Sequence, residues 1–334
     1  MIHFYLGLLL VAFLITSISV VPFINLLYKL KFQNKDTDIF NSNKTHKVGT
    51  PVGGGLLVIA AVTVLFFLVF PLLRASSIFV SSNYHIEREI LVLFFSFITF
   101  AIIGLYDDIV KFFGLPKEGV FGLSVASKFA LQVVAALVTS CLLYFSLNIN
   151  FVYIPFLGAI HLGPFYIIFA TTLILIFANF FNFTDGMDGL SCGLLMISLF
   201  TFWVLAGSSF DTPVSIFLSL WIGSIIAFLY FNIPPARIWL GDVGALSFGA
   251  TFAVIALILG KVVPLMIVGV PFLIEGLSST LQILSKKYLG KKIIPIAPLH
   301  YSFQYWGWPE YKIVFRAWLA AIILTIFALW LGLN

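Results

Sequence analysis

Residues 164–206 read PFYIIFATTLILIFANFFNFTDGMDGLSCGLLMISLFTFWVLA, in which two apolar segments enclose the polar stretch FNFTDGMDGL (181–190). Each apolar segment approaches the roughly 17–25 residues with which an α-helix crosses a bilayer. Carboxylates are costly inside a membrane, so acids that interrupt such segments either serve a function or lie at the membrane boundary. The number of similar segments in the rest of the chain decides the fold class.

Apolar segments of this kind recur along the whole chain, which is 61% hydrophobic and only 9% charged and has a mean hydropathy of +1.13. This composition excludes a soluble globular protein and predicts an all-α polytopic membrane protein with ten transmembrane helices and short loops. We expect a single integral membrane domain over residues 1–334. The predicted spans lie near 3–27, 51–73, 89–106, 124–147, 164–181, 190–206, 214–231, 244–260, 262–283 and 311–332.

Two segments depart from the regular pattern of spans and loops. The ninth predicted span contains Pro264, Gly269 and Pro271, and proline removes a backbone donor and disturbs the preceding helical turn. We therefore expect a bent ninth helix. Residues 148–163 alternate loosely in hydrophobicity and contain turn residues, which predicts a small hairpin on the outer side.

The 18 Lys and Arg residues divide unequally between the two sets of loops that ten spans create. Arg74, Arg88 and Lys261 belong to one set. The other set holds Lys29, Lys31, Lys35, Lys44, Lys47, Lys111, Lys117, Lys128, Arg237, Lys286, Lys287, Lys291, Lys292, Lys312 and Arg316. Because cytoplasmic loops carry the excess of basic residues, the larger set is predicted to face the cytoplasm and both termini to lie outside.

The acidic residues follow the same partition. Glu87, Glu89 and Asp211 fall on the outer side and are interpreted as ordinary solvated loop charges. Five aspartates fall at the cytoplasmic ends of predicted spans, namely Asp107, Asp108, Asp185, Asp188 and Asp242. Their convergence on one membrane face from separate segments predicts a cytoplasmic active-site cleft.

The motif LYDDIVKF (105–112) places two adjacent acids and a lysine at the end of the third span. On a helix, Lys111 lies within one turn of both Asp107 and Asp108. A helix-end ion pair is one interpretation. The alternative is a cation site, because adjacent carboxylates repel unless a cation lies between them, and Mg²⁺ favours one or two carboxylates plus substrate phosphates.

The stretch NFFNFTDGMDGL (179–190) spaces Asn179, Asn182, Asp185 and Asp188 three residues apart. A capping turn between two helices requires only one such residue. Four polar side chains exceed that need and favour contacts with a nucleoside. Carboxylates can accept hydrogen bonds from the imide N–H and the hydroxyl groups of a nucleoside. Gly186 would let the backbone turn tightly or approach a ligand closely.

A third motif, FNIPPARIWLGDVGALSFG (231–249), contains Asn232, Trp239 and Asp242. Asp242 is either a helix N-cap or a metal ligand that faces phosphate groups. Trp239 is either an interfacial residue or a ring that stacks on a base.

Two further loops carry basic groups. In HKVGTPVGGG (46–55), Lys47 is either a marker of the cytoplasmic side or a phosphate contact, and its glycines match neither nucleotide-binding fingerprint. In KKIIPIAPLHYSFQYWGWPE (291–310), His300 is either part of an interfacial loop, a phosphate or sugar contact, or a proton-transfer group. Glu275 and Gln282, late in the ninth span, are expected to face the protein interior.

Taken together and in this order, the motifs KVGTPVGGG, YDDIVK, NFTDGMDGL, WLGDVGALSFG and IAPLH…GWPE resemble the polyprenyl-phosphate N-acetylhexosamine-1-phosphate transferases. The resemblance extends from Lys47 to Arg316, and the GWPE element and outer hairpin favour the muramoyl-pentapeptide branch. It implies transfer of phospho-MurNAc-pentapeptide from UDP to undecaprenyl phosphate, giving lipid I and UMP, at the cytoplasmic face of the bacterial inner membrane. It also implies Mg²⁺, contact with membrane lipid and a homodimer, and no nucleic-acid partner.

The resemblance also assigns roles to residues of this chain. Asp107 and Asp108 match the catalytic acid pair of the family. Asp242 matches its magnesium ligand, and Asp108 is expected to be a second ligand of the same ion. Basic positions of the family correspond to Lys47, Lys111, Lys128 and His300. Positions around uridine and diphosphate correspond to Asn182, Asp185, Gly186, Met187, Asp188, Asn232, Trp239 and Gln282.

One stretch departs from the family pattern of three successive histidines. Only His300 is present, followed by Tyr301 and Ser302. The departure concerns a contact near the sugar and peptide, so a UDP-N-acetylglucosamine transferase is the main alternative. A secondary transporter is a remote one, since transporters place charges near the bilayer midplane and often contain inverted repeats. For the transferase, direct in-line displacement and a route through an aspartyl phosphate both remain open.

Overall fold

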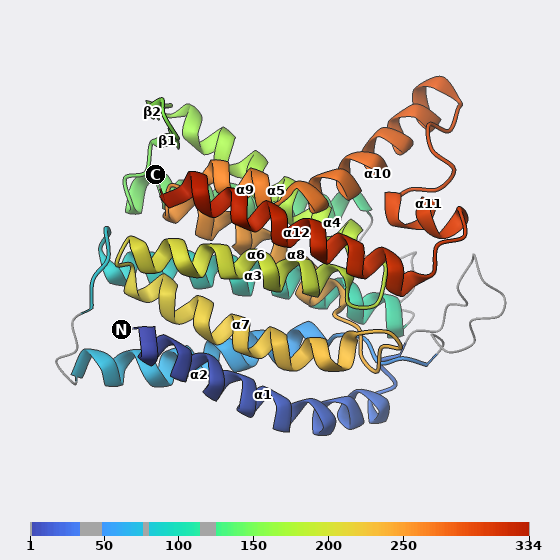
Figure 1. The fold of residues 1–334 in the computed structure, drawn as a ribbon, viewed down its shortest axis with the longest axis horizontal. Coiled ribbons are helices and arrows are strands. Elements are labelled where there is room, and N and C mark those ends of the chain that lie inside the picture. The colour runs from blue at the N-terminus through green and yellow to red at the C-terminus, as the bar shows by residue number, and fades with distance from the viewer. Residues whose placement is uncertain (1, 34–48, 76–79, 114–124, 334) are drawn as a thin grey trace.

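The structure is a computed structural model that describes residues 2–33, 49–75, 80–113 and 125–333. Its elements are almost entirely helical, which confirms the predicted all-α membrane fold (Figure 1). In chain order they are α1 (Ile2–Lys29), α2 (Gly54–Ala75), α3 (Ile86–Phe113), α4 (Val125–Cys141), a π-helical turn (Leu142–Ser146), β1 (Phe151–Ile154), β2 (Gly158–His161), α5 (Phe165–Thr184), α6 (Leu190–Ser208), α7 (Thr212–Asn232), α8 (Gly241–Ile258), α9 (Val262–Val268), α10 (Val270–Leu289), α11 (Leu299–Tyr305) and α12 (Glu310–Leu333).

Within the described residues, nine helices are long and apolar enough to cross a membrane, and the bent pair α9 and α10 passes the same test together, which allows up to ten spans. The two helices of that pair meet at an angle of 70° at Gly269, next to Pro271, so the predicted bend is confirmed. The predicted hairpin is also confirmed, because β1 and β2 pair antiparallel with Phe151 opposite His161. Figure 1 shows this hairpin at the end of the bundle opposite α11.

Helices α7 and α8 form the centre of the bundle, and nearly all of their residues are buried. α8 packs chiefly against α3 and α5, while α7 packs against α1. Small residues allow this close approach, as at membrane helix interfaces in general. Gly55 of α2 faces Gly244 of α8, and Gly249 of α8 lies against the backbone of Phe177 in α5. These close contacts fix the positions of the ends of α2, α5 and α8 relative to one another.

The last turn of α3 meets the first turn of α8, and we call this the basic end of the bundle. Its basic residues are Lys29, Lys111, Lys128, Arg237 and Lys312. α3 continues through Phe113, beyond the predicted boundary at residue 106, so its acidic pair lies on the helix itself. This extension is why the charged residues there have defined positions.

The prediction that Glu89 and Asp211 are solvated is wrong, although Glu87 is exposed as predicted. Glu89 is 0% and Asp211 1% exposed, and one carboxylate oxygen of each, Glu89 Oε1 and Asp211 Oδ2, has no partner among the described residues unless the two side chains hydrogen-bond to each other. Glu89 also accepts from the hydroxyl of Ser82, and Asp211 caps α7 by accepting from the backbone N–H of Val214 at 3.1 Å. Two carboxyl groups in such a bond must hold a proton between them, because burial disfavours two adjacent negative charges.

This buried carboxyl pair makes stability depend on pH. Burial raises the pKa of Asp211 above its ordinary value. A group whose pKa is raised by folding stabilises the folded state below its ordinary pKa, and that contribution is lost as pH rises through the raised value. We expect Glu89→Gln, whose amide donates to Asp211 without a shared proton, to unfold at a higher temperature than the wild type in alkaline buffer.

Thermal unfolding of the detergent-purified protein across a series of pH values measures this effect. The advantage of Glu89→Gln should be about 1–3 kcal/mol at high pH and should shrink as pH falls. Glu87→Gln, which removes an exposed acid paired with Arg74, is the matched control and should show no such trend. An equal pH trend in Glu89→Gln and the wild type would contradict the shared proton.

Candidate active site

Asp242, the second residue of α8, is the centre of the charged cluster at the basic end. Its Oδ2 atom accepts from Lys111 Nζ at 2.8 Å and forms a short ion pair with Lys128. Its Oδ1 atom accepts from the side-chain amide of Asn182 at 3.0 Å. Asp107 Oδ2 accepts from the same two lysines, at 2.8 Å from Lys111 and 2.7 Å from Lys128. Two carboxylates and two ammonium groups therefore alternate, contributed by α3, α4 and α8.

Asp108 joins the cluster in a different way. Its two carboxylate oxygens accept from the backbone N–H groups of Asp242 at 3.1 Å and Val243 at 3.0 Å. These N–H groups belong to the first turn of α8 and have no partner inside the helix. Asp108 thus caps α8 from α3 and fixes the position of Asp242. Its side chain is almost fully buried.

Gly104 also sets this geometry, and sequence reasoning missed it. A Cβ atom at Gly104 would lie 2.1 Å from the carbonyl oxygen of Asp242 and 2.6 Å from the backbone nitrogen of Val243. Backbone atoms of a packed helix cannot move aside as a flexible side chain can. The available signal was a small residue one turn before an acidic pair, which is too common in membrane helices to be specific.

We expect Gly104→Ala to separate α3 from α8 and to displace Asp242. Overpacking of this kind costs about 1–3 kcal/mol of stability, and the shift should also lower the turnover rate. Thermal unfolding and the assay described below measure the two effects. Gly7→Ala in α1, where no atom lies within 4 Å of the added Cβ, is the control and should be neutral. Unchanged stability and activity in Gly104→Ala would contradict this account of the α3–α8 contact.

The turn after α5 and the segment before α8 are joined by predicted substrate residues. Asp188 Oδ1 accepts from the indole N–H of Trp239 at 3.2 Å, and its Oδ2 accepts from the backbone N–H of Ala236 at 3.0 Å. Asn232 accepts from the N–H of Gly189 at 3.2 Å and donates to the carbonyl of Ile238 at 2.9 Å. The backbone N–H of Asp188 donates to Glu310 at 2.9 Å, a residue of the GWPE element. These bonds place Trp239 beside residues 185–189, the turn between α5 and α6 that we call the aspartate turn.

Asp185 lies between this turn and the charged cluster. The hydroxyl of Ser191 donates to its carboxyl group. Burial raises the pKa of Asp185 to about 7, and the nearby charges of Asp242 and Asp188 act in the same direction. Near neutral pH a fraction of this carboxyl group is therefore protonated and able to donate a hydrogen bond as well as accept one. Met187, in the same turn, is buried in the hydrophobic core.

His300 is fully buried at the start of α11. Its Nδ1 atom and its backbone N–H both lie within hydrogen-bonding distance of Glu275 Oε2, at 3.0 and 3.1 Å. Its Nε2 atom has no partner among the described residues and faces Gly186, where a Cβ would lie 2.4 Å away. The neighbouring Tyr301 hydroxyl donates to the carbonyl of Gly186 at 2.9 Å. His300 therefore packs beneath the aspartate turn.

Most of the predicted site residues come together at the basic end, with two exceptions. Gln282 binds the backbone of Ile293 and Ile294 through its side-chain amide, so its contacts shape the loop after α10. Lys47 lies outside the described residues. Within the described part of the chain, no three acidic, histidine or cysteine side chains form a closed metal cage.

Comparison with known proteins identifies the family. Residues 90–260 match the family described as glycosyl transferase family 4. Curated phospho-N-acetylmuramoyl-pentapeptide-transferases of Staphylococcus aureus, from strains bovine RF122 / ET3-1, MSSA476 and MW2, are each 32% identical over 329 residues. The alignments cover 97% of this chain and 98% of each relative. The alignments with these relatives extend beyond residues 90–260 and cover nearly the whole chain, and on this basis the chain belongs to glycosyl transferase family 4, in the group of the phospho-N-acetylmuramoyl-pentapeptide-transferases.

Proposed function

We propose that the chain transfers phospho-MurNAc-pentapeptide from its UDP-linked donor to undecaprenyl phosphate, with release of UMP and formation of lipid I. The observation that carries the proposal is the cluster of Asp107, Asp242, Lys111 and Lys128 beside the turn that holds Asp188 and Trp239. One part has the charges that phosphate chemistry requires, and the other has an aromatic ring and acceptors for a nucleoside. We place the site at the cytoplasmic face of the inner membrane, because the basic residues gather at the same end.

Both reactants are anions, so the site must first neutralise charge. Lys111 is half exposed and can follow the incoming phosphates, whereas Lys128 is mostly buried and holds Asp107 and Asp242 together. The acceptor phosphate is itself an ionised nucleophile near neutral pH and needs little help from a general base. This favours direct in-line attack on the β-phosphorus, with Asp107 or Asp108 able to accept a remaining proton.

The carboxylates of Asp108 and Asp242 fit Mg²⁺, a hard cation that takes oxygen ligands from one or two carboxylates and from substrate phosphates. Asp242 accepts from the Lys111 ammonium on one oxygen and from the neutral Asn182 amide on the other, and Asp108 lies against its backbone. We propose these two residues as the magnesium ligands. The ion would supply further neutralisation of the diphosphate charge.

Uridine recognition is assigned to the turn and the segment that faces it. The indole of Trp239 would stack on the base, and Asp185, Asp188 and Asn232 would meet polar groups of the nucleoside. His300, held by Glu275, supports Gly186 from below, so its contribution to donor binding would act through the position of that backbone. Contact with membrane lipid follows from the fold, and a homodimer stays a prediction of the resemblance.

Release of UMP by the purified chain with undecaprenyl phosphate and Mg²⁺ tests the proposal. UDP-MurNAc-pentapeptide and UDP-GlcNAc are compared as donors, because the altered stretch after His300 favours the second as the alternative. We expect turnover with the muramoyl donor and its loss when a chelator removes Mg²⁺. Turnover with UDP-GlcNAc alone would overturn the choice of donor, and absence of UMP with both would overturn the transferase proposal.

A further inference from the structure

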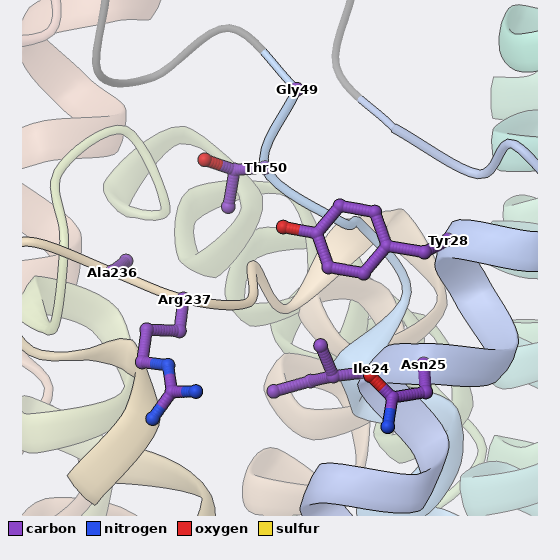
Figure 2. A pocket seen from close by; sticks show the side chains of 7 residues that line it. All are labelled: Ile24, Asn25, Tyr28, Gly49, Thr50, Ala236 and Arg237. Atoms are coloured by element: carbon purple, nitrogen blue, oxygen red, sulfur yellow. The ribbon is translucent and has the colours of Figure 1, made fainter.

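A pocket of about 300 Å³ lies at the basic end, between the end of α1 and the segment that carries Ala236 and Arg237. The end of α1, the residues before α2 and the segment before α8 form its walls. Figure 2 shows the α1 side chains on one side of the space and Arg237 on the other. The lining residues are Ile24, Asn25, Tyr28, Gly49, Thr50, Ala236 and Arg237.

The polar groups of this pocket have no other role in the described structure. The side chains of Asn25, Tyr28 and Thr50 form no hydrogen bond with any described residue. Arg237 contacts the ring of Phe231, 5.5 Å from the guanidinium carbon, but no described carboxylate pairs with it. Among the described residues that line the pocket, none is acidic. The pocket therefore has a positive charge and unpaired amide, phenol and hydroxyl donors around one space, a combination that fits an anion.

The position of the pocket favours an anion that belongs to the bilayer. Asn25 and Tyr28 lie in the last two turns of α1, just before Lys29. The apolar side chains on either side of Tyr28, Leu26 and Leu30, are about half exposed and face the region that lipid would occupy. An opening at this depth lies at the level of the phospholipid headgroups. Basic pockets between transmembrane helices at this level bind anionic headgroups.

We propose that the pocket binds the phosphate group of an anionic phospholipid, with Arg237 as the principal contact and Tyr28, Thr50 and Asn25 as neutral donors. The guanidinium group presents N–H donors in a fixed fork that matches two phosphate oxygens. The acyl chains would lie along the exposed apolar surface of α1.

Occupancy of the pocket would support the nucleotide site behind it. The N–H of Ala236, whose side chain lines the pocket, donates to Asp188 at 3.0 Å. The N–H of Trp239 donates to the carbonyl of Pro51, next to Thr50, at 2.8 Å. A phosphate held between Thr50 and Arg237 would fix both segments that meet at Trp239. This consequence for donor binding rests on the proposed function, whereas binding of the lipid does not.

The test measures lipid binding without any substrate, so its failure and that of the transferase proposal are distinguishable. The full-length protein is purified in a neutral detergent and mixed with phosphatidylglycerol, phosphatidylcholine or inorganic phosphate. Bound lipid is counted by native mass spectrometry and the unfolding temperature is recorded. We expect phosphatidylglycerol to bind and stabilise the wild type, and Arg237→Gln to weaken that binding about tenfold.

Matched variants separate the pocket from general surface charge. Lys29→Gln removes a positive charge one residue from Tyr28 without changing the pocket and should bind phosphatidylglycerol as the wild type does. Tyr28→Phe removes only an unpaired, exposed hydroxyl, so it should fold normally and still weaken binding. Equal affinity of the wild type, Arg237→Gln and Tyr28→Phe for phosphatidylglycerol would overturn the proposal. Equal stabilisation by phosphatidylcholine or by inorganic phosphate would overturn its lipid-headgroup specificity.

Discussion

Asp242→Asn is expected to lower the rate of UMP release by about 10³-fold. The substitution keeps the shape of the side chain but removes the charge that pairs with Lys111 and Lys128 and receives the Asn182 amide. It also removes one of the two proposed magnesium ligands. Loss of a single preorganised electrostatic contact typically costs 10²–10³-fold, and loss of a metal ligand at the same position adds to this. Initial rates at saturating donor and acceptor measure the effect.

The protein should remain folded, because Asp107 still pairs with both lysines in this variant. Circular dichroism and the unfolding temperature check that condition. Asp188→Asn is the comparison, since Asp188 lies on the nucleotide side and its loss should raise the KM for the donor more than it lowers kcat. A turnover rate of Asp242→Asn within tenfold of the wild type would contradict a catalytic role for the Asp242 carboxylate.

The fold was predictable from sequence because membrane insertion depends on local properties. An apolar segment of sufficient length becomes a span wherever it lies, and the prolines at 264 and 271 bend the ninth span through local backbone chemistry. The ends of spans were less predictable. α3 continues seven residues beyond its predicted boundary, to Phe113, because helical hydrogen bonding does not stop where hydropathy falls.

The residues of the candidate site were predictable from sequence, but the contacts between their side chains were not. Sequence places Asp107 and Lys111 on one helix turn, yet nothing local indicates that Lys128 of α4 reaches both Asp107 and Asp242. The burial of Glu89 and Asp211 was missed for the same reason. An acid beside a loop looks solvated until another acid from a distant helix is known to face it.

His300 shows how tertiary structure narrows a functional prediction. From sequence, it was either part of an interfacial loop, a phosphate or sugar contact, or a proton-transfer group. The structure places its Nδ1 atom on Glu275 and its Nε2 atom against Gly186, beneath the aspartate turn. Sequence had indicated that Glu275 faces the interior, but its partner lies 25 residues away. Only the arrangement of α10 and α11 brings the two together.

Asp108→Asn is expected to lower both activity and stability, and the combination distinguishes Asp108 from Asp242. The wild-type carboxylate accepts from two backbone N–H groups of α8. An asparagine keeps one acceptor oxygen and turns an NH₂ group toward the second N–H, which leaves a buried donor unpaired. Such a loss costs about 1–3 kcal/mol, so the unfolding temperature should fall clearly below that of Asp242→Asn.

Activity of Asp108→Asn should fall at least about 10²-fold even at temperatures where the variant is fully folded, because the first turn of α8 carries Asp242. Asp108→Glu is the informative comparison: it retains the charge and both acceptor oxygens but displaces them by one methylene group. If Asp108 acts mainly as the cap of α8, the glutamate variant should regain part of the stability and little of the activity, since the reacting groups remain misplaced. Full activity of Asp108→Asn in its folded state would contradict both the capping role and the proposed contact with magnesium, because each requires a carboxylate at this position.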